Sequence, residues 1–420
     1  MTTLTEPESH NAIDAIWRIE SARIIGGLTR IVGDIDLAEE LAGDALVAAL
    51  QQWPRTGVPD NPGAWLMATA KRRAIDQYRR FKTLERKQIE IGRALEEEQA
   101  RSEEVLDAAL DDPVGDDMLR LIFMTCHPVL AREARVALTL RLLGGLTTDE
   151  IARAFLVPDA TIAQRIVRAK RTLKAAQVPF EVPRAVDLPT RLASVLEVIY
   201  LIFNEGYAAT SGTDWIRPAL YEDALRLGRI LTELMPAEPE VHGLVALMEI
   251  QASRTAARTG PQGEPIPLLE QDRARWDHLL IQRGLGALER ATGLGPLGPY
   301  ALQGAIAACH ARARTADETE WARIAALYDA LAQLMPSPVV ELNRAVAVGF
   351  AFGPAAGLEL ADALLNEPAL QGYHLLPAVR ADLLRKLGRL DEARTEFERA
   401  AGLTRNARER QVLLERAAAC

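Results

Sequence analysis

Apolar residues recur three and four positions apart along almost the whole chain. That spacing places them on one face of an α-helix, whereas a half-buried β-strand would need alternation at every second position. Alanine, leucine, arginine and glutamate dominate, and no convincing β-branched alternation interrupts the pattern. The sequence therefore predicts an all-α fold. Because 420 residues exceed what one compact core usually holds, we expect two or three domains.

Composition excludes several classes of protein. Charged residues break every apolar run before it reaches the roughly 18 residues that a membrane helix needs. The N-terminus lacks the basic start and apolar core of a signal peptide, so we expect a soluble, cytoplasmic protein with no membrane partner. Cys126, Cys309 and Cys420 are far apart and form no CxxC pair, which argues against a disulfide framework or a cysteine-rich zinc site. We predict no metal and no cofactor.

Proline and glycine punctuation divides the chain at residues 53–63, 111–115 and 178–183. We predict a helical domain over 10–87, a linker over 88–115, a small helical domain over 116–177 and a long helical region over 184–420. Charge follows the same division, because residues 71–87 carry a net charge of +6 and residues 90–117 a net charge of -9. A cationic segment beside an acidic one indicates a DNA-binding face followed by a solvated or steering linker.

The strongest local signal lies at residues 145–166. Thr147 and Glu150 have the spacing of a capping box that opens a first helix, Pro158 interrupts it, and a second helix is expected from Asp159. This pattern predicts a helix-turn-helix whose second helix enters the major groove of DNA. The alternative is an ordinary amphipathic hairpin with a solvated basic face. From Thr161 to Lys174 the chain has five basic residues and no acid, which favours contact with phosphate.

Side-chain roles within this motif follow from helical spacing. The small core is predicted to consist of Ile151, Ala152, Phe155, Val157, Ile162 and Ile166. The surface facing DNA is predicted to comprise Thr161, Ala163, Gln164, Arg165, Arg168, Lys170 and Arg171.

A helix-turn-helix alone does not distinguish a repressor from other classes of DNA-binding protein. Two N-terminal segments make that distinction. Residues 36–50 resemble the helix with which sigma factors of the sigma-70 superfamily dock on RNA polymerase. Residues 61–80 resemble the segment that reads and melts the minus-ten promoter element, and the helix-turn-helix domain is similar to the one that binds the minus-thirty-five element. With no further sigma domain between them, the resemblance over residues 10–177 is to the extracytoplasmic-function group. It implies two partners, core RNA polymerase and promoter DNA.

The resemblance assigns residues to two of these surfaces. For polymerase docking it implies Asp36, Glu39, Glu40, Leu41, Asp44 and Leu46. For the minus-ten element it implies Asn61, Trp65, Lys71, Arg72, Arg73, Tyr78, Arg79 and Arg80. Melted DNA needs cations along its backbone and aromatic surfaces for its bases, which these residues supply. Core packing is nevertheless the favoured role of Trp65, because aromatic residues at helical spacing are usually buried.

This sequence departs from the family pattern at two of these positions. Many relatives have lysine where Ala163 stands and asparagine where Arg72 stands. The promoter sequence that those relatives recognise therefore cannot be assigned to this protein.

The C-terminal region repeats itself faintly. The segment 231–236 recurs at 331–336, each ending an amphipathic helix, and residues 381–400 place small residues where two helices must approach, with Gly388 at the turn between them. This resembles a tetratricopeptide repeat. Residues 201–212, 271–277 and 343–348 look like stretches of a sigma group with a tetratricopeptide-like extension. We predict that this region controls the sigma domains through a protein or small-ligand partner.

Polar and aromatic residues of the extension form a candidate groove. Its members are Asn204, Glu205, Tyr207, Asp272, Trp276 and Asp277. A structural role for them, in fixing helix ends and packing, is an equal alternative.

Two other functions compete with promoter recognition. A conventional helix-turn-helix regulator with a helical sensor domain would leave residues 36–50 and 61–80 unexplained. An enzyme is suggested only by residues 204–207 and by the pairs Cys126-His127 and Cys309-His310. Adjacent side chains on a helix point in different directions, and no glycine-rich phosphate loop or nucleophile elbow is present. We therefore predict that the protein is not an enzyme.

Overall fold

A computed structural model of the chain describes residues 6–88, 114–155, 157–207, 218–260, 266–404 and 406–420. Within these ranges the regular structure is helical and contains no β-strand, so the predicted all-α class is confirmed. The chain divides into two compact units, Met1–Val198 and Ile199–Cys420. None of the helices in the described ranges is both long and apolar enough to cross a membrane.

The first unit begins with three long helices. They are α1 (Glu6–Val32), α2 (Ile35–Thr56) and α3 (Pro62–Gln88). Asp34 caps α2 by accepting hydrogen bonds from the backbone N–H groups of Asp36 and Leu37. Alanines recur along the buried face of α2 and let α1 pack closely against it.

Four shorter helices follow in the same unit. They are α5 (Val114–Thr125), α6 (Arg132–Leu142), α7 (Thr148–Phe155) and α8 (Asp159–Ala175). Helix α5 contacts α1, and α8 packs on α6 and α7. Most of the linker predicted for 88–115 falls outside the described residues.

Helix α9 (Leu188–Tyr207) begins in the first unit and ends in the second. Arg191 donates to the carbonyl oxygen of Phe123 at 2.7 Å, and the Ser194 hydroxyl donates to that of Cys126 at 2.6 Å. Glu197 lies 2.7 Å from a guanidinium nitrogen of Arg132. The start of α9 thus caps carbonyl groups left open at the end of α5. The first compact unit therefore extends beyond the boundary expected at 177–184.

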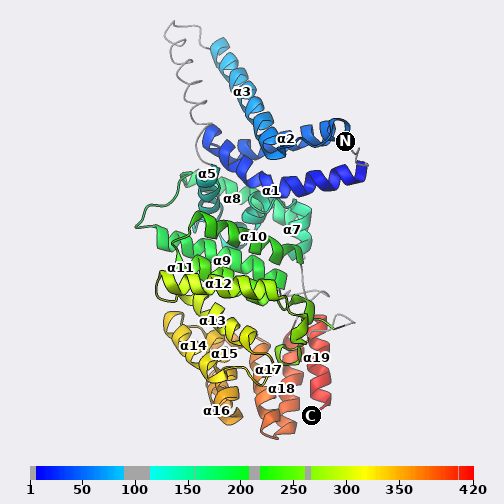
Figure 1. The fold of residues 1–420 in the computed structure, drawn as a ribbon, viewed down its shortest axis with the longest axis vertical. Helices are drawn as coiled ribbons and strands as arrows, with labels where there is room; N and C mark the ends of the chain where they lie inside the picture. Colours follow the sequence, from blue (N-terminus) through cyan, green and yellow to red (C-terminus); the bar gives the residue numbers. More distant parts are fainter. Residues whose placement is uncertain (1–5, 89–113, 156, 208–217, 261–265, 405) are drawn as a thin grey trace. The chain divides into compact units, whose positions relative to one another are not determined.

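The second unit continues as antiparallel helices that neighbour one another in chain order (Figure 1). Its longer helices are α10 (Pro218–Leu234), α11 (Pro239–Ala252), α12 (His278–Leu294), α13 (Pro299–Arg312), α14 (Trp321–Leu334), α15 (Pro338–Phe352), α16 (Pro354–Ala363), α17 (Leu375–Lys386), α18 (Leu390–Leu403) and α19 (Ala407–Ala418). Short 3₁₀ turns lie at Thr255–Ala257, Leu268–Glu270, Arg273–Arg275 and Pro368–Leu370. Helix α11 is buried along almost its whole length against α12 and α13.

The helical-hairpin character predicted for this region is confirmed. Helices end at Leu234 and Leu334, within the repeated segments 231–236 and 331–336, and each is followed by a helix that opens with proline. The turn between α17 and α18 contains Gly388 at φ +77°, a left-handed conformation that suits glycine. Ala393 and Phe397 are fully buried in the hairpin that follows this turn.

Candidate DNA and polymerase interface

The helix-turn-helix forms as predicted. The Thr147 hydroxyl accepts from the Glu150 backbone N–H at 3.2 Å, and the Glu150 carboxylate accepts from the Thr147 backbone N–H at 2.8 Å. This reciprocal capping box opens α7, and α8 begins at Asp159 after the break at Pro158. The predicted core residues Ile151, Ala152, Ile162 and Ile166 are buried, whereas Phe155 and Val157 are half-buried.

The residues predicted to face DNA lie along α8 in different environments. Ala163, Gln164, Arg168 and Arg171 are exposed, and Thr161 and Arg165 are half-buried. The exception is Lys170, whose side chain is only 11% exposed because acidic residues of α2 surround it. Their contact with DNA stays a prediction.

The predicted docking residues of α2 divide in the same way. Asp36, Glu40 and Asp44 are exposed, and Glu39 and Leu46 are half-buried. Leu41 is 2% exposed and packs inside the helical core, so it offers no surface to a polymerase. Instead of the predicted contact with polymerase, Leu41 packs in the core and stabilises α2. Exposed and buried residues alternate along α2 because the helix buries one face against α1 and α3.

Helix α3 carries the predicted minus-ten residues. Asn61 caps this helix, since its side-chain oxygen accepts from the Ala64 backbone N–H at 3.0 Å. Trp65 is half-buried and makes an edge-to-face contact with Trp53, with ring centroids 5.3 Å apart, as a packing role requires. Arg73 pairs with Asp44 at 2.7 Å.

The remaining residues of this set are distributed along the same helix. Lys71 is half-buried and Arg72 is exposed. Tyr78, Arg79 and Arg80 belong to α3, but their side chains lie outside the described residues.

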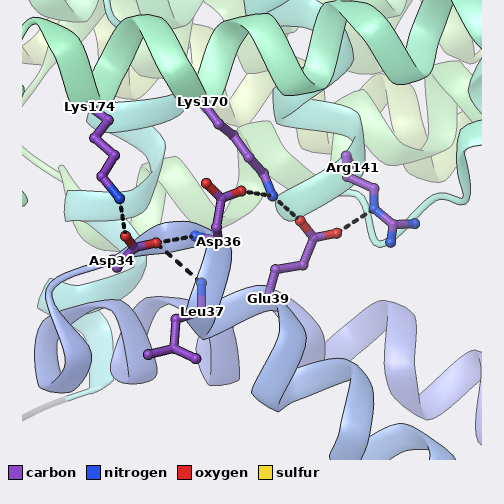
Figure 2. A network of polar contacts seen from close by, with 7 residues as sticks. All are labelled: Asp34, Asp36, Leu37, Glu39, Arg141, Lys170 and Lys174. Carbon is purple, nitrogen blue, oxygen red and sulfur yellow. Dashed lines mark hydrogen bonds and ion pairs between the residues drawn. The ribbon is translucent and has the colours of Figure 1, made fainter. Parts of the chain in front are cut away.

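An ion-pair network joins the predicted docking helix to the predicted recognition helix (Figure 2). Lys170 Nζ lies 2.5 Å from Glu39 Oε2 and 2.8 Å from Asp36 Oδ1. Glu39 Oε1 also accepts from Arg141 Nε at 2.6 Å, and Lys174 Nζ lies 2.8 Å from Asp34 Oδ2. Residues predicted to bind two different partners are thus bonded to each other.

Burial and charge act in opposite directions on these groups. Burial of Glu39 opposes its ionisation, but Lys170 and Arg141 outweigh that effect and hold its pKa below the ordinary value. Burial of Lys170 likewise opposes its positive charge, but Glu39 and Asp36 outweigh it and raise the pKa of the ammonium group. The hydrogen bond from Lys174 lowers the pKa of Asp34. Asp34 and Glu39 are therefore ionised, and Lys170 is protonated, near neutral pH.

Helix α1 makes two further connections within this unit. Arg18 pairs with Glu150, the capping-box residue of α7, at 2.5 Å. Arg30 and Arg120 both bind the buried carboxylate of Asp117, at 2.9 and 2.7 Å. The sequence reasoning identified neither connection, because the partners are up to 132 residues apart along the chain.

The candidate groove residues of the second unit fall into three groups. Asp272 and Asp277 cap the turn at Arg273–Arg275 and α12, so their carboxylates have structural roles. Tyr207 and Trp276 are buried and lie beneath arginine side chains. Asn204 and Glu205 are half-buried on α9, and Asn204 hydrogen-bonds Tyr200.

The cysteines of the two Cys-His pairs are buried free thiols. Burial raises the pKa of both Cys126 and Cys309, which disfavours the reactive thiolate. Cys126 instead lies 3.4 Å from the Thr139 hydroxyl within a hydrogen-bonded interior. Among the residues that the structure describes, no group of three or more potential metal ligands occurs.

Comparison with known families assigns both parts of the first unit. Residues 19–83 match sigma-70 region 2 and residues 120–173 match sigma-70 region 4. The chain belongs to the extracytoplasmic-function group of sigma-70 factors. Region 2 of this sigma factor covers most of α1 to α3, and region 4 covers most of α5 to α8. Residues 191–292 match a family of unknown function, DUF6596, which covers most of α9 to α12.

Relatives of the chain include an uncharacterized protein and two sigma factors. An uncharacterized protein of Rhizobium meliloti (strain 1021) is 44% identical over 386 residues, which is 92% of this chain and 90% of that protein. The probable extracytoplasmic-function sigma factor SigI of Mycobacterium tuberculosis is 27% identical over 42% of this chain and 59% of its own length. SigK of Mycobacterium sp. (strain KMS) is 27% identical over 39% of this chain and 82% of its own. Sigma factors are initiation factors and not enzymes.

Proposed function

We propose that this sigma factor binds core RNA polymerase through the exposed acidic face of α2 and directs it to promoters in the cytoplasm. The minus-ten element would contact α3, and the minus-thirty-five element would contact α8. The observation that carries this proposal is the pairing of a region 2 match with a region 4 match on one chain. The exposed cations Arg72, Arg168 and Arg171 suit contact with DNA phosphate.

Promoter recognition on this proposal requires the network of Figure 2 to open. The two promoter elements are centred about 25 base pairs apart, which corresponds to about 85 Å of B-DNA. Lys170 of region 4 lies within 2.8 Å of two carboxylates of region 2, and α8 has 17 residues, a length of about 26 Å. The 28 residues of the predicted linker can span at most about 90 Å. Both elements are therefore within reach only after α8 leaves α2.

We further propose that the C-terminal unit controls the sigma domains. The supporting observation is α9, whose first half binds region 4 through Arg191, Ser194 and Glu197 before the helix continues into the second unit. A rearrangement of the second unit that moved α9 would disturb the end of α5. A helical-hairpin array also offers surface for a protein or small-ligand partner.

Co-purification of core RNA polymerase tests the proposal. The full-length protein is compared with a fragment of residues 1–207, which keeps the whole of α9; a fragment ending at 183 would strip the Arg191 and Ser194 contacts from region 4. Capture by both would support a sigma factor, and transcription from a mapped promoter would then measure control by the C-terminal unit. Capture by the fragment alone would indicate an autoinhibitory tail, and capture by full length alone would make the tail part of the docking surface. Capture by neither would favour a conventional regulator.

Equal promoter activity of the two proteins would contradict control by the C-terminal unit. It would leave the assignment of regions 2 and 4 untouched.

A further inference from the structure

A cavity of about 670 Å³ lies in the first unit, beside the segment that leads into α9. Its volume is typical of small-molecule sites, which measure about 300–1,000 Å³. His127, in the turn between α5 and α6, supplies one lining side chain, and residues 179–191 supply the others. The cavity therefore joins region 4 to the start of α9.

The lining carries charges of both signs. Arg184 and Arg191 are cations, and Glu181 and Asp187 are anions. Arg184 pairs with Asp187 at 3.4 Å. Within the described part of the first unit, Arg191 and Glu181 form no ion pair of their own. Burial lowers the pKa of Arg191, but the nearby charge of Glu181 opposes that effect. The cavity thus offers one cation and one anion, close together and unpaired.

Two side chains of the lining have hydrogen-bond donors to spare. Arg191 Nη2 donates to the carbonyl oxygen of Phe123 at 2.7 Å, whereas Nε is buried without a partner and Nη1 bonds no described residue. Burial and the charge of Arg191 lower the pKa of His127 to about 4, so its ring is neutral near pH 7. His127 Nδ1 accepts from the Val129 backbone N–H at 3.1 Å, which places the ring proton on Nε2. Both side chains suit a ligand that accepts hydrogen bonds.

We propose that this cavity binds a free α-amino acid, whose carboxylate accepts from Arg191 and His127 and whose ammonium group pairs with Glu181. An α-amino acid carries its two opposite charges on one carbon atom, which matches a cation and an anion that lie close together. A simple anion would be repelled by Glu181, and a simple cation by Arg191. Val186, which is 78% exposed, offers apolar surface to the side chain of the ligand.

This site goes beyond promoter recognition, since binding needs neither polymerase nor DNA. A bound ligand would connect His127 of region 4 to α9 beside the bond between Arg191 and Phe123. Only its use as a signal for transcription rests on the proposed control by the C-terminal unit. A failure to bind amino acids would therefore leave the sigma assignment intact.

The first test measures thermal unfolding of the full-length protein with each proteinogenic amino acid alone. We expect at least one to raise the unfolding temperature, because a ligand that binds the folded state stabilises it. Calorimetric titration then compares that amino acid with its N-acetyl derivative, which lacks the ammonium group, and with its amide, which lacks the carboxylate. Each derivative should bind roughly five- to tenfold more weakly.

A substitution tests the assigned partner of the ammonium group. Glu181→Gln, at an exposed position, should weaken binding of the amino acid roughly five- to tenfold but leave binding of its N-acetyl derivative unchanged. The control Glu289→Gln removes an equal charge from an exposed position of α12 and should leave both affinities unchanged.

Three results would overturn the site. The first is that no amino acid stabilises the protein. The second is that either derivative binds as tightly as its parent, which would indicate a simple anion or cation site. The third is an equal loss of affinity in Glu181→Gln and Glu289→Gln.

Discussion

Replacing Glu39 by glutamine should loosen the contact between region 2 and region 4. Glu39 bonds Lys170 at 2.5 Å and Arg141 at 2.6 Å, and its side chain is only 19% exposed. Glutamine has the same shape but no charge, so both cations lose their shared counter-ion. Lys170 keeps Asp36 at 2.8 Å, but that carboxylate is 57% exposed and screened by water.

The size of the effect follows from these environments. A hydrogen bond to a charged, half-buried group contributes about 1.5–3 kcal/mol, whereas an exposed ion pair contributes about 1 kcal/mol or less. Taking about 1.5–2 kcal/mol for the lost charge, the ratio of open to closed molecules should rise roughly 10- to 30-fold. Added salt should open the native protein in the same direction.

Fluorescence energy transfer between α2 and α8 measures this opening in the free protein. Val47 and Val167 are exposed positions on the two helices and can each be replaced by a labelled cysteine. Cys126 and Cys309 are buried, and Cys420 can be changed to serine. Glu39→Gln should lower the transfer efficiency.

The neighbouring Glu40→Gln removes the same charge from an exposed position and serves as the control. Equal transfer efficiency in the native protein and both variants would refute the argument that Glu39 holds the two regions together.

Three further substitutions test packing and titration. The free energy of unfolding should fall as pH drops from about 6.5 toward 4, because burial holds the pKa of folded His310 at about 4 while the unfolded chain binds a proton there at higher pH. His310→Gln should reduce this loss of stability at acid pH by roughly 1–3 kcal/mol, measured by urea unfolding at several pH values. Gly388→Ala should destabilise the protein by about 1–2 kcal/mol because its φ is +77°, whereas Gly402→Ala in α18 should not, as thermal unfolding would show. Phe397→Ala should cost about 3–5 kcal/mol in chemical unfolding, since the ring is fully buried.

Helix boundaries could be predicted because their signals are local. The capping box of Thr147 and Glu150, the prolines that open α11 and α15, and the glycine after α17 each act within about one turn of a helix. The helix-turn-helix core followed from the same short-range spacing. The fold class and the order of the helical segments therefore needed no knowledge of distant contacts.

Interactions between distant helices could not be predicted in the same way. Lys170 lies in a run of bases without acids, which favours DNA, but its partner Glu39 is 131 residues away. One available signal was the excess of acids at the start of α2 opposite a basic helix elsewhere in the chain. The docking role of Leu41 was implied by the resemblance of the whole segment 36–50, which does not say which of its residues are buried against neighbouring helices.

The break at 178–183 lies between the region 4 match, which ends at residue 173, and the DUF6596 match, which begins at residue 191, although the first compact unit extends to Val198. Proline ends a helix because it lacks a backbone donor and crowds the preceding turn, but neither property stops the chain from returning to the same core. Here it does return, and α9 covers the carbonyl groups of Phe123 and Cys126 before entering the second unit. A single continuous helix thus contributes to both compact units.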